Sequence, residues 1–98
     1  MATEVRIAPQ VEQFVKSLAP EPRRALRQAM KGMAKGQGDT KALEGKLAGW
    51  RRLRVSRCRV LYKETAEGGV RVINCVFASH RSVVYEMFAQ LLADELVR

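Results

Sequence analysis

Hydrophobic residues recur along the chain with two spacings, which divide its first third into a strand and two helices. Within residues 3–7, Val5 and Ile7 alternate with polar residues, which is the period of a half-buried strand. Residues 11–18 and 26–33 repeat apolar side chains at i, i+3, i+4 and i+7, the spacing of one helix face. Prolines between these two stretches break the helix, so the pattern predicts a helical hairpin.

The second half of the chain reads mainly as strands. Apolar runs predict strands at about 50–55, 57–64 and 70–78, with turns at Ser56–Arg57 and over 65–69. The last run is apolar on both faces at its far end, so we expect it at the centre of the sheet. Residues 39–49 show no such pattern and are expected to be irregular. An amphipathic helix over 83–96 completes the series.

The predicted order is β-α-α-β-β-β-α, which indicates an α+β fold. We expect a mostly antiparallel four-stranded sheet packed by an N-terminal helical hairpin and a C-terminal helix, with the helices on one side of the sheet. The 98 residues are enough for a single domain, so we assign 1–98 to one domain.

Charge narrows the range of partners. Lysine and arginine outnumber acidic residues 18 to 10, giving a net charge of +8. A small domain with this charge is drawn to polyanions: nucleic acid, the ribosome, an anionic membrane or an acidic protein. No apolar run approaches the ~20 residues of a bilayer span, and the N-terminus lacks the apolar segment of a secretory signal. We therefore expect a cytoplasmic protein.

Two cysteines are too few and too far apart for a disulfide framework or a zinc site. Cys58 and Cys75 would be cross-strand neighbours if their strands paired through a turn near Gly68–Gly69. We nevertheless expect buried free thiols, because the cytosol is reducing.

Arginines occupy alternate positions of the first of the three later strands. Arg52 and Arg54 share one face of that strand, whereas Leu53 points to the other. The guanidinium fork matches phosphate oxygens, so the pair could clamp a phosphodiester together with Arg59 on the next strand. On spacing alone, a solvated strand face with idle charges is the alternative.

Three further candidates follow the last strand: His80, Arg81 and Tyr85. Imidazole can accept or donate a proton near neutral pH, so His80 is a candidate general base or acid. It could equally be a surface residue at a strand end. Tyr85 could donate a proton, stack on a base or close the core at the start of the last helix.

Basic side chains also line one side of the second predicted helix, with no acidic residue among them. A face of one sign binds phosphate without reading sequence, so this side could dock on ribosomal RNA or could simply be solvated. Its residues are Arg23, Arg24, Arg27, Lys31 and Lys35.

Taken together, these pieces resemble the RelE/ParE superfamily of type II toxins, and RelE-like mRNA interferases in particular. The resemblance covers nearly the whole chain, although its helical half is generic. The matching pieces are the leading strand with its hairpin, Leu43-Glu44-Gly45, the run from Trp50 to Tyr62, and His80-Arg81-Ser82 with Val84-Tyr85. The run from Trp50 to Tyr62 is fairly specific to the superfamily, and the His-Arg…Val-Tyr ending favours the RNA-cleaving branch over the gyrase-poisoning ParE branch.

The resemblance implies a ribosome-dependent endoribonuclease that inhibits translation by driving a 2′-OH against the adjacent phosphate, without metal or cofactor. By position, Arg52 and Arg54 match paired basic residues of the family, and Arg59 matches the arginine that contacts the scissile phosphate. Arg81 and Tyr85 match an arginine and a tyrosine near the C-terminus.

One position departs from the family pattern. Where RelE carries a further catalytic arginine, this chain has Ser79. This leaves His80 or Arg81 to take the place of that arginine.

The implied partners are a cognate antitoxin, the ribosome and mRNA, and operator DNA only as a toxin–antitoxin complex; no membrane is implied. Two alternatives stay open. One is a ParE-like, non-nucleolytic inhibitor of DNA gyrase, and the other is an inactive basic module that binds its antitoxin.

Overall fold

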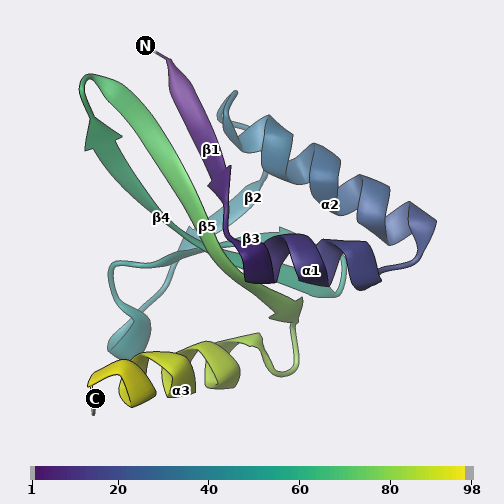
Figure 1. Ribbon diagram of the computed structural model, residues 1–98, viewed down its shortest axis with the longest axis vertical. Helices are drawn as coiled ribbons and strands as arrows, with labels where there is room; N and C mark the ends of the chain where they lie inside the picture. Colours follow the sequence, from purple (N-terminus) through teal and green to yellow (C-terminus); the bar gives the residue numbers. More distant parts are fainter. Residues whose placement is uncertain (1, 97–98) are drawn as a thin grey trace.

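The helices and strands of the chain are arranged around one twisted sheet, as seen in the computed structural model, which describes residues 2–96 (Figure 1). The elements are β1 (Thr3–Ile7), α1 (Pro9–Ser17), α2 (Pro20–Met33), β2 (Asp39–Ala42), the 3₁₀ turn η1 (Gly45–Leu47), β3 (Arg51–Val55), β4 (Cys58–Glu67), β5 (Val70–His80) and α3 (Val84–Leu96). The five strands lie in the order β1-β5-β4-β3-β2. Only β1 and β5 run parallel, so the prediction of a mostly antiparallel α+β fold is confirmed.

The fifth strand, β2, is a correction to the predicted four-stranded sheet. Residues 39–49 were expected to be irregular, but 39–42 pair antiparallel with β3 at the edge of the sheet. Gly38 precedes the strand with a φ of 117°, a backbone conformation that glycine adopts readily. Only Thr40 of this strand is even partly buried, so the strand carries no apolar alternation to reveal it.

The helical hairpin α1–α2 covers one face of the sheet, which we call the hairpin face. The core there joins apolar residues of both helices to alternate residues of the central strands. Its buried members are Val11, Val15, Leu26, Met30, Met33, Leu53, Cys58, Val60, Tyr62, Ile73, Cys75 and Ala78. β5 lies between β1 and β4, so its predicted central place in the sheet is confirmed.

The C-terminal helix α3 packs on the opposite face, which we call the α3 face (Figure 1). There Leu61 and Phe77 of the sheet contact Val84 and Phe88 of α3, and the Phe88 ring meets Trp50 edge-on at 4.9 Å. The expectation that the helices share one side is therefore wrong. β4 and β5 carry apolar side chains on both faces of the sheet. Helices must therefore pack on both faces to shield these side chains from water.

Two tight turns fix the registers that matter for the site. The β4–β5 loop was predicted over 65–69 but consists of Gly68 and Gly69 alone, each with positive φ, as a two-residue hairpin of this kind requires. The β3–β4 turn is Ser56–Arg57, as predicted, with Ser56 at a φ of 55°. Within the described residues, no helix has the length and apolar composition needed to cross a bilayer.

Candidate phosphate-binding site

Cross-strand register brings the predicted arginines together on the α3 face. Arg54 of β3 lies directly opposite Arg59 of β4, Arg59 lies opposite Ser79 of β5, and Arg54 lies opposite Asp39 of β2. Arg52 comes two residues before Arg54 and so points to the same face. We call Arg52, Arg54 and Arg59 the arginine cluster. The strand register thus places all three residues on one face of the sheet, and their use as a phosphate clamp stays a prediction.

Arg59 is the most firmly held member of the cluster. It is 9% exposed, and its Nη1 donates hydrogen bonds to the carbonyl oxygens of Ser56 at 3.0 Å and Cys58 at 2.9 Å. Both acceptors belong to the β3–β4 turn or the residue after it. The turn thus holds Nη1 of the guanidinium in place before any ligand binds. Less side-chain freedom is then lost on binding, which lowers its entropy cost.

Asp39 is the acidic counterpart of the cluster. One of its carboxylate oxygens lies 3.2 Å from Arg52 Nη1, and the other lies 2.7 Å from Arg54 Nε. Arg52 also donates to the Asp39 backbone carbonyl at 3.0 Å. The hydrogen bond from Arg52 and the charge of Arg54 lower the pKa of the Asp39 carboxyl. Asp39 therefore stays ionised and occupies two guanidinium groups that a phosphate would use.

His80 does not join the arginine cluster. It lies opposite Cys58, whose side chain belongs to the core under the hairpin, so His80 is on the hairpin face. Its ring contacts Phe14 of α1 edge-on, with the ring centroids 5.3 Å apart. The sheet thus separates His80 from Arg54 and Arg59, against the expectation that all of them form one site.

The remaining candidates from the C-terminal part of the chain lie near the end of β5. Arg81 is exposed in the turn after β5, where its backbone N–H donates to the Arg57 carbonyl at 2.8 Å. Tyr85 lies in the first turn of α3, half-buried against the apolar cluster of the α3 face. Ser79, opposite Arg59, is 8% exposed, and its Oγ lies 3.9 Å from Met87 Sδ. Tyr85 thus shares the α3 side of the sheet with the arginine cluster.

The basic face of α2 lies on the other side of the sheet and is partly used by the fold itself. Arg23 Nη2 donates to the carbonyls of Lys16 and Leu18 at the end of α1, at 3.2 and 2.9 Å. Arg27 pairs with Glu12 of α1 at 2.9 Å. The other three predicted contact residues, Arg24, Lys31 and Lys35, are exposed.

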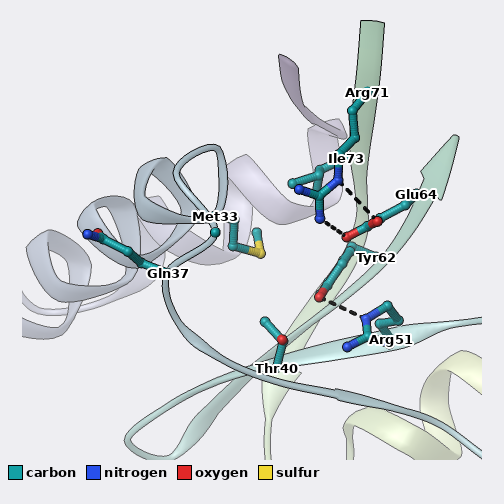
Figure 2. A pocket seen from close by; sticks show the side chains of 9 residues that line it. Met33, Gln37, Thr40, Arg51, Tyr62, Glu64, Arg71 and Ile73 are labelled. Atoms are coloured by element: carbon teal, nitrogen blue, oxygen red, sulfur yellow. Dashed lines mark hydrogen bonds and ion pairs between the residues drawn. The ribbon is translucent and has the colours of Figure 1, made fainter. Parts of the chain in front are cut away.

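A small polar pocket of about 90 Å³ lies on the hairpin face, beside the end of α2 (Figure 2). The buried Tyr62 hydroxyl accepts a hydrogen bond from Arg51 Nε at 3.2 Å, and Arg71 pairs with Glu64 above it. These pairs satisfy polar groups next to the core. The pocket is on the opposite face from the arginine cluster, so Arg51 is not a further member of it.

Sequence reasoning missed Asp39 and Lys41, which face the cluster from β2. Lys41 is in register with Arg52, so it adds a cation to the same face. The sequence offered only an indirect signal for Asp39. Several arginines on one strand face repel each other, so an acidic residue is expected nearby. Among residues 2–96, no group of three or more His, Cys, Asp or Glu side chains could hold a metal ion.

The cysteines are free and buried, as expected, but they are not cross-strand neighbours. Cys58 lies opposite His80, and Cys75 lies opposite Tyr62. Burial raises the pKa of the Cys75 thiol to about 12.

Comparison with known proteins gives a clear result at the level of structure. No protein-family model matches the sequence, and no curated protein matches it either. A chain of the toxin–antitoxin complex RelBE2 from Mycobacterium tuberculosis has 24% identity and a TM-score of 0.66, covering 83% of this chain and 100% of that one. A chain of the RelE–RelB complex from Pyrococcus horikoshii OT3 has 24% identity and a TM-score of 0.62, covering 83% and 97%.

A YoeB/ParE toxin from Agrobacterium tumefaciens is also similar in structure. It has 13% identity and a TM-score of 0.63, and the alignment covers 80% of this chain and 98% of that one. The chain therefore has the fold of RelE/ParE-superfamily toxins, over nearly the full length of each similar chain.

Proposed function

We propose that this protein is the toxin of a type II toxin–antitoxin system and that it cleaves mRNA on the ribosome. The observation that carries the proposal is the arginine cluster on the α3 face of a RelE-like fold, with Arg59 fixed by the β3–β4 turn. The similar solved chains come from toxin–antitoxin complexes, which supports the toxin part of the proposal.

The cluster suits charge stabilisation in phosphodiester cleavage. When a 2′-oxygen bonds to the adjacent phosphorus, losing its proton, the bond to the 5′-oxygen breaks and that oxygen leaves as a hydroxyl. Negative charge gathers on the phosphate oxygens during this step, and donors held in place beforehand stabilise it. Arg59 contacts the scissile phosphate in this scheme, while Arg52 and Arg54 bind its oxygens after releasing Asp39. Tyr85 supplies an aromatic face for a base or a phenolic proton. Arg81, exposed beyond β5, binds flanking phosphate. The scheme uses neither metal nor cofactor.

The proposed partners follow from the proposed function as a ribosome-dependent toxin. The ribosome positions mRNA at the cluster, and three exposed cations, Arg24 and Lys31 of α2 and Lys35 in the turn after it, contact ribosomal RNA. An acidic antitoxin segment binds the toxin and covers the arginine cluster, and operator DNA is bound only by the toxin–antitoxin complex. All these steps take place in the cytoplasm.

A translation reaction with purified protein tests the proposal. Mapping of mRNA 3′ ends should show new ends that carry a 2′,3′-cyclic phosphate or 3′-phosphate. Arg59→Ala should reduce the cleavage rate by about 10²-fold or more, because one preset charge-stabilising donor is lost. Lys16→Gln removes one charge from an exposed position on α1 and should cleave normally. Absence of new ends on programmed ribosomes would rule out the nuclease.

One observation favours a second candidate function, inhibition of DNA gyrase. Ser79 lies directly opposite Arg59, at the position where RNA-cleaving relatives are expected to carry an arginine. The cluster is thus one cation short of the full set. A supercoiling assay distinguishes the two functions: inhibition of gyrase without RNA cleavage supports the second, and cleavage without inhibition supports the first.

A further inference from the structure

A cavity of about 300 Å³ opens on the hairpin face, between the hairpin and the β3–β4 turn. Leu18, Leu26 and Val55 are among its apolar walls, and apolar surface dominates its lining. The polar side chains of Cys58 and His80 lie at its sheet end. The arginine cluster is on the other face, so this cavity is a separate feature that phosphate binding leaves unexplained.

Cys58 and His80 both line this cavity, and they lie opposite each other on neighbouring strands. They are directly opposite in the β4–β5 register, and such neighbours have Cβ atoms about 5 Å apart. Cys58 is 7% exposed, and the His80 ring contacts Phe14 edge-on. At this separation the imidazole can take the thiol proton through one bridging water.

We propose that Cys58 is a modification site for apolar α,β-unsaturated carbonyl compounds that enter this cavity. His80 takes the thiol proton, and the sulfur forms a bond to the β-carbon of the compound. The electron pair of the C=C π bond moves to the α-carbon, which then accepts the proton from His80. The product is a thioether, and no oxidant or other co-reactant is consumed.

The environment of the thiol makes the base necessary. Burial raises the pKa of the Cys58 thiol, and the nearby charge of Arg59 opposes this shift. A buried thiol in apolar surroundings is inert unless a neighbouring group removes its proton. His80 is the imidazole that faces the cavity, and the apolar walls select the body of the electrophile.

Modification would reach the arginine cluster through the β3–β4 turn. Arg59 is anchored by the carbonyls of Ser56 and Cys58, and both residues line the cavity. An adduct on the Cys58 sulfur would displace this turn and release the anchor of Arg59. The resulting loss of mRNA cleavage rests on the proposed function, whereas the modification itself does not.

Labelling of the folded protein with N-phenylmaleimide, followed by intact mass measurement, tests the modification. Cys75→Ser leaves Cys58 as the reporter, and Cys58→Ser leaves Cys75, a matched thiol that is 1% exposed. Each rate is divided by the rate for free N-acetylcysteine. Labelling rates with N-phenylmaleimide and with unsubstituted maleimide are compared to show whether the cavity favours an apolar reagent. Labelling in urea gives the reactivity of each thiol in the unfolded chain.

The Cys75→Ser protein should gain one adduct about tenfold faster than the Cys58→Ser protein, with the phenyl reagent favoured. Adding His80→Gln should slow labelling of Cys58 about tenfold, with an unchanged circular dichroism spectrum. Equal labelling of the two cysteines, no phenyl preference, or a rate that His80→Gln leaves unchanged or raises would overturn the proposal. The assay needs no ribosomes, so its failure is distinct from failure of the nuclease.

Discussion

Arg54 and Arg59 face each other across two neighbouring strands, an arrangement of like charges that destabilises a sheet. Asp39 reduces the repulsion by pairing with Arg54, and also with Arg52. Arg59 meets backbone carbonyls instead of an acid. The fold thus holds together three cations whose mutual repulsion a bound phosphate would relieve.

Asp39→Asn should strengthen binding of RNA, because Arg52 and Arg54 no longer have to release a carboxylate. We expect an affinity gain of about tenfold at low salt, as for other close charge pairs. Fluorescence anisotropy with a labelled single-stranded RNA measures it. The charge-matched control is Glu21→Gln, which removes an exposed acid from the start of α2. Equal gains for the two variants would show that Asp39 does not compete for the cluster.

Asp39 should also affect the acid stability of the fold. Its pKa is lowered in the folded state, so its contribution to stability is fully present above its unfolded pKa of about 3.9. That contribution is lost as the pH falls through the lower, folded pKa. Urea unfolding should therefore separate wild type from Asp39→Asn at about pH 7 and bring them closer at about pH 3. A constant difference would contradict the ion pairing.

The sequence predicted the shared face of Arg52 and Arg54 because side chains alternate strictly along a strand. It could not place His80 on the same principle. The face of His80 depends on where the register of β5 against β4 shifts, and that shift lies between Leu61 and Tyr62. An irregularity of one residue moves every later side chain to the opposite face.

Among the elements, β2 depends on Gly38 for its entry into the sheet. An alanine Cβ at Gly38 would lie 3.0 Å from Leu53 Cδ1 and would require a φ of 117°. Gly38→Ala should therefore lower the free energy of unfolding by about 2–3 kcal/mol. Gly36→Ala meets no neighbouring atom, so it should cost about 1 kcal/mol from its positive φ alone. Chemical denaturation measures both, and equal costs would contradict the packing at Leu53.

The helix α3 is attached to the sheet through a few large side chains, chiefly Phe88. Phe88→Ala should lower the free energy of unfolding by about 3–5 kcal/mol, because it removes contacts with Trp50 and Phe77. Leu91→Ala, at a residue 47% exposed, should cost about 0.5 kcal/mol or less. Thermal or urea unfolding of the two variants measures these losses of stability. Similar costs would mean that α3 does not depend on this cluster.

The helix periods identified both arms of the hairpin and α3, because 3.6-residue spacing is a strong local signal. They could not say which side of the sheet α3 covers. That choice depends on β4, where Cys58 to Tyr62 are five consecutive buried residues and both faces need a cover. The edge strand β2 had too few buried residues to produce a signal.

Across the whole molecule, the net charge of +8 favours partners of opposite sign. Association with the acidic antitoxin proposed above, tested with a small protein encoded beside this one, should weaken about tenfold as salt rises from about 0.05 to about 0.5 M. Isothermal titration at both salt concentrations measures the change. An affinity that does not vary with salt would exclude electrostatic attraction as a main contribution.

The central claim is that phosphate is held on the α3 face by the arginine cluster, and that His80, on the other face, takes no part. Single-turnover cleavage of mRNA on programmed ribosomes, comparing Arg59→Ala with His80→Gln, tests this most directly. The account predicts a loss of about 10²-fold or more for Arg59→Ala and a rate within about threefold of wild type for His80→Gln. A loss for His80→Gln as large as that for Arg59→Ala would contradict it.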